Sequence, residues 1–169
     1  MRNALLTLVL TLISLHGYCQ CESFPYRNLI EFESDTTAYV MYNYMERSEC
    51  HKGKTVNDFL NEFELKIESF LLSVDTDNPE NLIGIVLFPY EVNEVGRRNH
   101  FQLETHAVRL YFESPVKSKP LLKKADKWGK NRWNRKIFKE LKDYKIKLTR
   151  SLIYSYSPYK EKYKDKIED

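Results

Sequence analysis

The run Leu82-Ile83-Gly84-Ile85-Val86-Leu87-Phe88 decides the fold of this 169-residue chain. It is almost continuously apolar, and a short apolar run bounded by turn residues predicts a strand in the middle of a sheet. The residues before it, 75–80 (Asp-Thr-Asp-Asn-Pro-Glu), form a turn cluster. The sequence therefore predicts a buried central strand that follows a tight turn.

The segment before this turn predicts a short helix and then a strand. Thr55 is a good N-cap, and Asp58, three residues later, completes an acidic variant of the capping box. Residues 64–72 then alternate in a way that favours a strand. Continued helix is the alternative, because the apolar residues of this stretch also keep helical spacing.

Three further stretches predict strands. Residues 36–45 are rich in β-branched and aromatic side chains, residues 102–113 alternate and end at Ser114-Pro115, and residues 146–154 alternate again. A basic helix is expected from about residue 120 to 141, broken at Gly129. Strands joined by short loops pair antiparallel, so we expect an α+β fold with one mainly antiparallel sheet and helices packed on one face.

The first nineteen residues are typical of a secretory signal. Arg2 is followed by the uncharged apolar run 4–15, and small residues precede a cleavage point between Cys19 and Gln20. As a helix this run would rise only about 18 Å, against a hydrocarbon core of about 30 Å. A buried core helix and an uncleaved anchor are the alternatives. The expected organisation is a signal peptide at 1–19, one α+β domain at 20–157 and a charged flexible tail at 158–169.

Three cysteines are present, and cleavage after Cys19 would leave Cys21 and Cys50. In an oxidising compartment such an isolated pair predicts a disulfide that ties the N-terminal arm to the domain. Two free thiols are one alternative. A lipoprotein acylated at Cys19 or Cys21 is another, which would place the domain on a membrane surface, although neither cysteine follows the usual Leu-small-small pattern.

Charge is divided unevenly along the chain. Residues 20–116 contain 8 Lys and Arg against 17 Asp and Glu, while residues 117–169 contain 18 against 7. Aromatic side chains stand among the cations of residues 127–136, so Lys130, Arg132, Trp133 and Arg135 are candidate ligand-binding residues for phosphates, nucleic acid or lipid headgroups. The favoured interpretation is structural: the basic helix lies against the acidic half, or is a solvated face with Trp133 in the core.

Arg97 and Arg98 are further candidate binding residues, in what we expect to be a loop between strands. The chain contains no Gly-x-Ser-x-Gly, no His-Glu-x-x-His and no glycine-rich phosphate loop, so no residue is predicted to be catalytic. Glu91, Glu94 and Glu104 could pair for acid–base chemistry, but nothing selects them. His100 and His106 would share a strand face without a regular ligand spacing, so no metal and no cofactor are expected.

Four stretches carry a resemblance: 53–60 (Gly-Lys-Thr-Val-Asn-Asp-Phe-Leu), 83–87 (Ile-Gly-Ile-Val-Leu), 94–98 (Glu-Val-Gly-Arg-Arg) and 108–112 (Val-Arg-Leu-Tyr-Phe). With them the chain resembles small exported proteins of Bacteroidetes that have no assigned function. The resemblance covers about residues 53–116 and implies export, without assigning a catalytic residue.

The sequence favours a non-enzymatic, exported binding protein of the cell envelope, periplasmic or on the cell surface, with a lipid anchor as the alternative. A specific version is an immunity-type protein that blocks a toxin by electrostatic complementarity. The expected partner is another envelope protein, a membrane surface is a partner if the chain is lipidated, and nucleic acid is disfavoured. The alternatives are an envelope hydrolase with an unrecognised site and a module that binds anionic lipids or polyanions.

Overall fold

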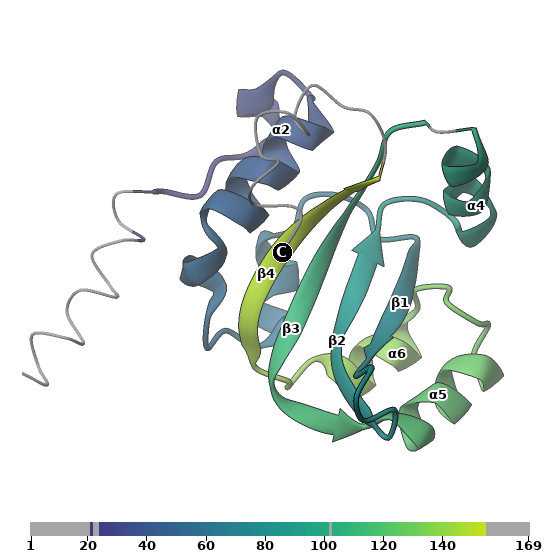
Figure 1. Cartoon of the computed structure of the whole chain (residues 1–169). Helices are drawn as coiled ribbons and strands as arrows, with labels where there is room; N and C mark the ends of the chain where they lie inside the picture. The colour runs from purple at the N-terminus through teal and green to yellow at the C-terminus, as the bar shows by residue number, and fades with distance from the viewer. Residues whose placement is uncertain (1–20, 22–23, 102, 155–169) are drawn as a thin grey trace, which may run out of the picture.

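A four-stranded antiparallel sheet forms the centre of the computed structural model, which describes residues 21, 24–101 and 103–154 (Figure 1). Its strands β1 (Ser69–Val74), β2 (Asn81–Phe88), β3 (Thr105–Lys117) and β4 (Ile146–Tyr154) lie side by side in chain order. Every neighbouring pair is antiparallel. The predicted α+β class and the antiparallel sheet are therefore confirmed.

Helices precede the sheet, connect its strands and complete the core. They are, in chain order, η1 (Leu29–Phe32), α2 (Thr36–Met41), the π-helix η2 (Tyr42–Glu46), η3 (Ser48–His51), α3 (Val56–Glu62), α4 (Val92–His100), α5 (Ser118–Lys127) and α6 (Arg135–Leu141). In Figure 1 the strands cross in front of α6, α5 lies beside the β1–β2 turn, and α4 lies beyond the opposite end of these strands.

The main core lies between one face of the sheet and the helices. Ile85 and Leu87 of β2 and Leu110 of β3 point into it and are fully buried. Buried side chains of α2, α3, α5 and α6 cover this face, among them Phe59 and Ile137. The described helices other than α4 therefore pack on one face, as the sequence predicts.

A smaller cluster lies on the opposite face, at the end nearest α4. Val86, Phe88 and Ala107 are buried there, with Val95 of α4 packed against them. The rest of this face is much less covered: Leu71 of β1 stays 43% exposed.

The helical form of residues 36–46 corrects one prediction. Instead of a strand, these residues form α2 and η2. Asp35 begins the helix by accepting hydrogen bonds from the backbone N–H groups of Thr37 and Ala38. Tyr39 and Tyr44 then lie fully buried, with their hydroxyl groups 2.9 Å apart. Strand propensity was overridden by this cap and by burial of one helical side.

The expected loop around Arg97 and Arg98 is also wrong, because these residues lie in the last turn of α4. Glu94, one turn earlier, pairs with both guanidinium groups at 2.7 and 3.4 Å. Such spacing supports a helix locally. Gly96 also lies within this helix.

Two strand ends differ from their predicted positions. β3 continues to Lys117 instead of ending at Pro115, and its pairing with β2 shifts between Leu82 and Gly84. Proline lacks an N–H donor and is tolerated at such irregularities. β1 begins only at Ser69, so the first part of the predicted strand 64–72 is irregular backbone.

Several local predictions are confirmed. Thr55 and Asp58 form the reciprocal capping box of α3. β4 occupies residues 146–154, and the basic helix is divided into α5 and α6. The break follows from Gly129, whose φ of 108° only glycine adopts readily, and from the Lys130 N–H, which donates to the Ala125 carbonyl at 3.1 Å. This is one of the two hydrogen bonds of a Schellman helix end.

Both edges of the sheet are engaged by other segments of the chain. On the β1 side, the Phe70 N–H donates to the Asn131 carbonyl at 2.8 Å, and the Trp133 N–H donates to the Glu68 carbonyl. On the β4 side, the Ser48 hydroxyl donates to the Thr149 carbonyl at 2.8 Å. The start of β4 is joined to residues 53–56, where the Gly53 N–H donates to the Ile146 carbonyl.

Cys21 and Cys50 lie at disulfide distance, with their Cα atoms 5.4 Å apart, which confirms the predicted pairing. The predicted signal peptide at 1–19 and tail at 158–169 lie outside the described residues. In the part of the chain that is described, none of the helices has both the length and the apolarity that crossing a membrane needs.

Candidate binding pocket and basic surface

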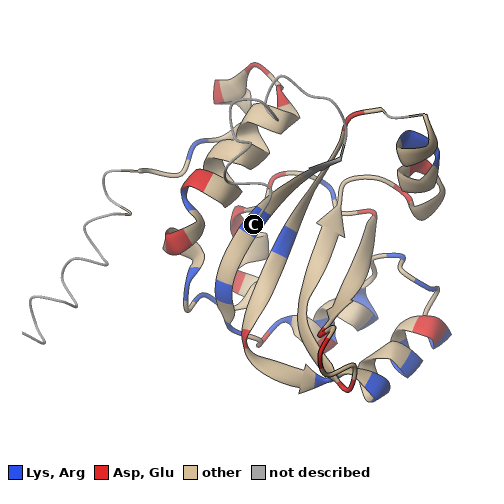
Figure 2. Cartoon of the chain, viewed as in Figure 1, with Lys and Arg blue, Asp and Glu red and all other residues tan. Residues whose placement is uncertain are grey.

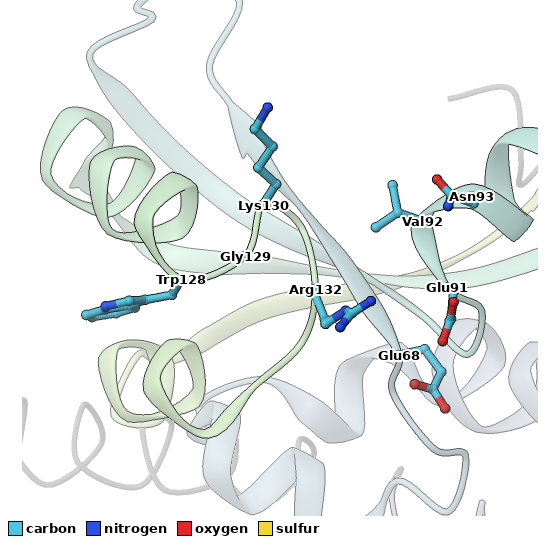
Figure 3. Close-up of a pocket in the computed structure, with 8 residues that line it drawn as sticks. All are labelled: Glu68, Glu91, Val92, Asn93, Trp128, Gly129, Lys130 and Arg132. Atoms are coloured by element: carbon cyan, nitrogen blue, oxygen red, sulfur yellow. The ribbon is translucent and has the colours of Figure 1, made fainter.

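A pocket of about 430 Å³ opens where the start of β1, the start of α4 and the α5–α6 connection meet (Figure 3). This volume is within the range of small-ligand sites. The lining residues are Glu68, Glu91, Val92, Asn93, Trp128, Gly129, Lys130 and Arg132. Two of the candidate residues, Lys130 and Arg132, are thus brought together in one place.

The wall formed by the α5–α6 connection is fixed by backbone contacts. Asn134 caps α6 by accepting from the Lys136 and Ile137 N–H groups, and its amide donates to the carbonyl oxygens of Trp128 and Arg132. One asparagine therefore holds the ends of the connection in place.

Opposite charges line the two sides of the pocket. Figure 3 shows the Arg132 side chain extending toward Glu91 and Glu68, while the Trp128 ring is directed away from both carboxylates. Lys66 forms an ion pair with Glu68, and the hydrogen bond and charge of Glu68 raise the pKa of this lysine. The pocket can bind a polar ligand that has both hydrogen-bond donors and a negative group.

The remaining members of the predicted basic site lie elsewhere. Trp133 is partly buried and packs edge-on against Phe70 with their ring centroids 5.9 Å apart, so its indole is engaged with the core and does not line the pocket. Arg135 is exposed at the start of α6, outside the pocket lining. Of the four predicted residues, Lys130 and Arg132 therefore line this pocket, and Trp133 and Arg135 do not.

Arg97 and Arg98 are also separate from this pocket, because their charges are engaged on α4. Besides its pair with Glu94, Arg98 lies over the Tyr90 ring at 4.5 Å from the centroid. It also donates from Nε to the Glu104 carbonyl at 2.9 Å. These contacts make Arg98 a structural link between α4 and the start of β3.

A wider basic surface surrounds the α5–α6 side of the pocket. Its members are the exposed cations of the β3 end, α5, the connection and α6: Lys117, Lys119, Lys123, Lys127, Lys130, Arg132, Arg135, Lys136 and Lys139. Figure 2 shows the blue segments along α5 and α6. Of these nine, Lys119 alone forms an ion pair within the described chain, with Glu80 at 3.3 Å. The acidic half of the described chain therefore does not cover this basic surface.

Two of the histidines, His51 and His106, are buried, which favours their neutral form. His51 lies in η3, fully buried, and its Nε2 meets the Asn43 carbonyl at 2.8 Å. His106 on β3 contacts the Tyr90 hydroxyl through Nδ1 at 3.0 Å. Burial lowers the pKa of each to about 4.

The prediction that His100 and His106 share a strand face is wrong, because His100 is exposed at the end of α4. Among the residues that the structure describes, no group of three or more His, Cys, Asp or Glu side chains could hold a metal ion.

Glu68 and Trp128 are pocket residues that the sequence alone did not single out. Glu68 enters the site because the Trp133 N–H binds its carbonyl and draws the α5–α6 connection against β1. This pairing joins residues more than sixty positions apart, and no local pattern signals it. Glu91 stood among the candidate carboxylates, but the reason to select it is its place in the pocket.

Comparisons of the chain with models of protein families, with curated proteins and with solved structures gave no match in any of the three.

Proposed function

We propose that this chain is an exported, non-enzymatic binding protein of the cell envelope, which captures an acidic partner protein through its basic surface. The observation that carries the proposal is that these cations are exposed and, with one exception, without a carboxylate partner in the described chain. An immunity-type role, in which the partner is a toxin, is one form of this function.

Electrostatic complementarity explains why such a surface suits a protein partner. Charges of one sign gathered on one side accelerate encounter with an acidic surface and disfavour basic competitors. Most of the cations lie on α5 and α6, which are anchored to the core by Leu121, Ala125, Ile137 and Leu141, so packing fixes the backbone that carries them. A rigid basic side needs little ordering before it binds.

Export is supported by the sequence of residues 1–19 and by the Cys21–Cys50 pair. A disulfide between these cysteines would persist in an oxidising compartment. The partner is therefore sought in the envelope.

The test is affinity purification from the envelope fraction of the native host with two matched variants. One carries Lys123→Glu, Lys127→Glu and Lys139→Glu on the basic surface, and the other carries Lys52→Glu, Lys145→Glu and Lys147→Glu at exposed positions elsewhere. We expect a specific acidic protein with wild type and with the second variant, bound about tenfold to hundredfold more weakly by the first. Equal capture by both variants, or no partner at all, would contradict the proposal.

An envelope hydrolase is the second candidate, favoured by the presence of Glu68 and Glu91 on one pocket. Two carboxylates beside a glycosidic bond can act as acid and base or nucleophile. The measurement is release of reducing ends from purified envelope polysaccharide. Activity that is lost in Glu68→Gln and in Glu91→Gln, and kept in the exposed control Glu113→Gln, would favour this candidate; no release by wild type would exclude it.

A further inference from the structure

The sheet face opposite the helices carries two arginines directly opposite each other. Arg109 on β3 is in register with Arg150 on β4, and the same row continues through Val86 on β2 to Leu71 on β1. These side chains cross the sheet in one line, apolar on β1 and β2 and basic on β3 and β4. We call this line the arginine row.

The arginine row is unfavourable in the isolated chain. Like charges directly opposite on neighbouring strands repel each other. Arg109 donates from Nη1 to the Tyr111 hydroxyl at 3.1 Å, but its Nε is buried without a hydrogen-bond partner. Within the described residues, neither Arg109 nor Arg150 forms an ion pair with a carboxylate. A buried donor that lacks an acceptor is costly. Because neither guanidinium group has a carboxylate partner in the described chain, the row can accept a carboxylate from outside.

A hollow of about 360 Å³ lies beside the row on the same face. Leu71, Val86, Arg109 and Tyr111 are among its lining residues. In the neighbouring row, Gly84 stands between Ser73 and Tyr111 and adds no side chain. The hollow therefore has a mixed lining: apolar side chains, the hydroxyl groups of Ser73 and Thr76 and, at one side, a guanidinium group and a phenol hydroxyl.

We propose that this face docks an acidic segment of the partner protein, with an Asp or Glu carboxylate held by Arg109 and Arg150 and a neighbouring apolar side chain in the hollow. The inference rests on the proposed function: the basic surface attracts the partner and the arginine row holds it. Desolvated arginines with apolar neighbours are typical of the residues that dominate binding energy at protein interfaces. Apolar side chains beside the cations favour such a segment over a small free anion.

The test is selection of a random dodecamer peptide library on the immobilised protein, followed by binding kinetics of the selected peptides. The variant is Arg150→Glu, and the matched control is Lys147→Glu, an exposed position on the same strand. We expect peptides with Asp or Glu beside Leu, Ile or Phe, and a loss of at least about tenfold in affinity for Arg150→Glu, mainly through faster dissociation. Lys147→Glu should bind as wild type does.

A second readout needs no partner. Arg150→Glu places opposite charges across β3 and β4, so its Tm should rise by about 2 to 4 °C while binding is lost. Lys147→Glu should leave the Tm unchanged. An unchanged or lower Tm for Arg150→Glu would overturn the claim that the row is held at a cost.

The remaining outcomes separate this inference from the proposed function. If the basic-surface variant weakens peptide binding and Arg150→Glu does not, the docking face is overturned and the proposed function still stands. If the binding of acidic peptides depends on Arg150 but no envelope protein is captured, the docking face is supported and the proposed function is overturned.

Two other occupants would also overturn the docking of a partner. A dimer in sedimentation that dissociates in Leu71→Glu would assign the face to a second copy of the chain. Peptide binding that appears only after deletion of residues 155–169 would assign the face to the chain's own C-terminal segment.

Discussion

Gly84 on β2 approaches the Leu110 carbonyl of β3 so closely that a Cβ on the glycine would lie 2.2 Å from this oxygen. The atom it would meet is backbone in the neighbouring strand, so no side-chain rotation can relieve the contact. The glycine is therefore required by the spacing of two strands in the middle of the sheet.

Gly84→Ala should destabilise the protein by about 2 to 4 kcal/mol, because β2 and β3 must separate to admit the methyl group. Urea denaturation followed by circular dichroism measures this loss. Gly96→Ala is the matched control, since nothing lies within 4 Å of its Cβ position in α4. That change should be neutral or stabilising by up to about 1 kcal/mol. Equal effects of the two substitutions would contradict the strand geometry.

Replacement of Cys21 and Cys50 by serine should lower the free energy of unfolding by about 3 to 4 kcal/mol. The cysteines are 29 positions apart, and chain entropy gives this size for a loop of that length. Urea denaturation of wild type with and without reductant provides the comparison, because a reductant should reproduce the double variant. A loss below about 1 kcal/mol would show that the pair does not constrain the unfolded chain.

Stability should decrease as the pH falls from about 6.5 toward 4, because His51 and His106 are buried in the neutral form. Burial places the pKa of both at about 4, below the ordinary value of 6.5, so the unfolded chain binds protons that the folded chain excludes. Each histidine contributes a slope of up to about 1.4 kcal/mol per pH unit in this window. Above pH 7 the contribution is complete and the slope disappears.

His106→Gln should reduce this slope between pH 5 and 6.5, and the exposed control His100→Gln should leave it unchanged. Denaturant midpoints at several pH values supply the measurement. For His106, burial outweighs the nearby carboxylates of Glu104 and Asp35, which act in the opposite direction. A slope that is the same in wild type and His106→Gln would mean that folding does not lower the pKa of His106.

Tyr39→Phe should cost about 1 to 3 kcal/mol, because the Tyr39 hydroxyl contacts three groups. It lies 2.7 Å from the Tyr26 hydroxyl and 2.9 Å from that of Tyr44, and it accepts from the Glu64 N–H at 3.0 Å. Tyr42→Phe removes a single hydrogen bond, to the Pro25 carbonyl, and should cost less than about 1 kcal/mol. Thermal unfolding of both variants checks the order, and a larger loss for Tyr42→Phe would refute it.

The sequence predicted the parts of the fold whose causes are local. The capping box at Thr55, the glycine break at residue 129 and the alternation of residues 146–154 each act within a few residues, and each appears in the structure. The central strand followed from its continuous apolar character. Residues 36–45 were misassigned because aromatic and β-branched residues fit a buried helical side as well as a strand, and the Asp35 cap was overlooked.

The candidate site was only partly predictable, for a different physical reason. Lys130 and Arg132 could be selected from local charge, but Glu68 joins them through a backbone bridge that connects distant segments. The arginine row depends on strand register, which sets Arg109 opposite Arg150. Local composition contains no information about register, so neither feature could be recognised before the strands were paired.

The engaged edges of the sheet limit how this protein can meet other chains. Ser48 and residues 53–56 occupy hydrogen-bonding groups along the first half of β4, and residues 131–133 occupy those at the start of β1. In the described part of the chain, a partner strand that paired with either edge would meet only short stretches of backbone with free hydrogen-bonding groups. This arrangement disfavours strand-to-strand aggregation through these edges, and it favours side-chain recognition as the route to complex formation.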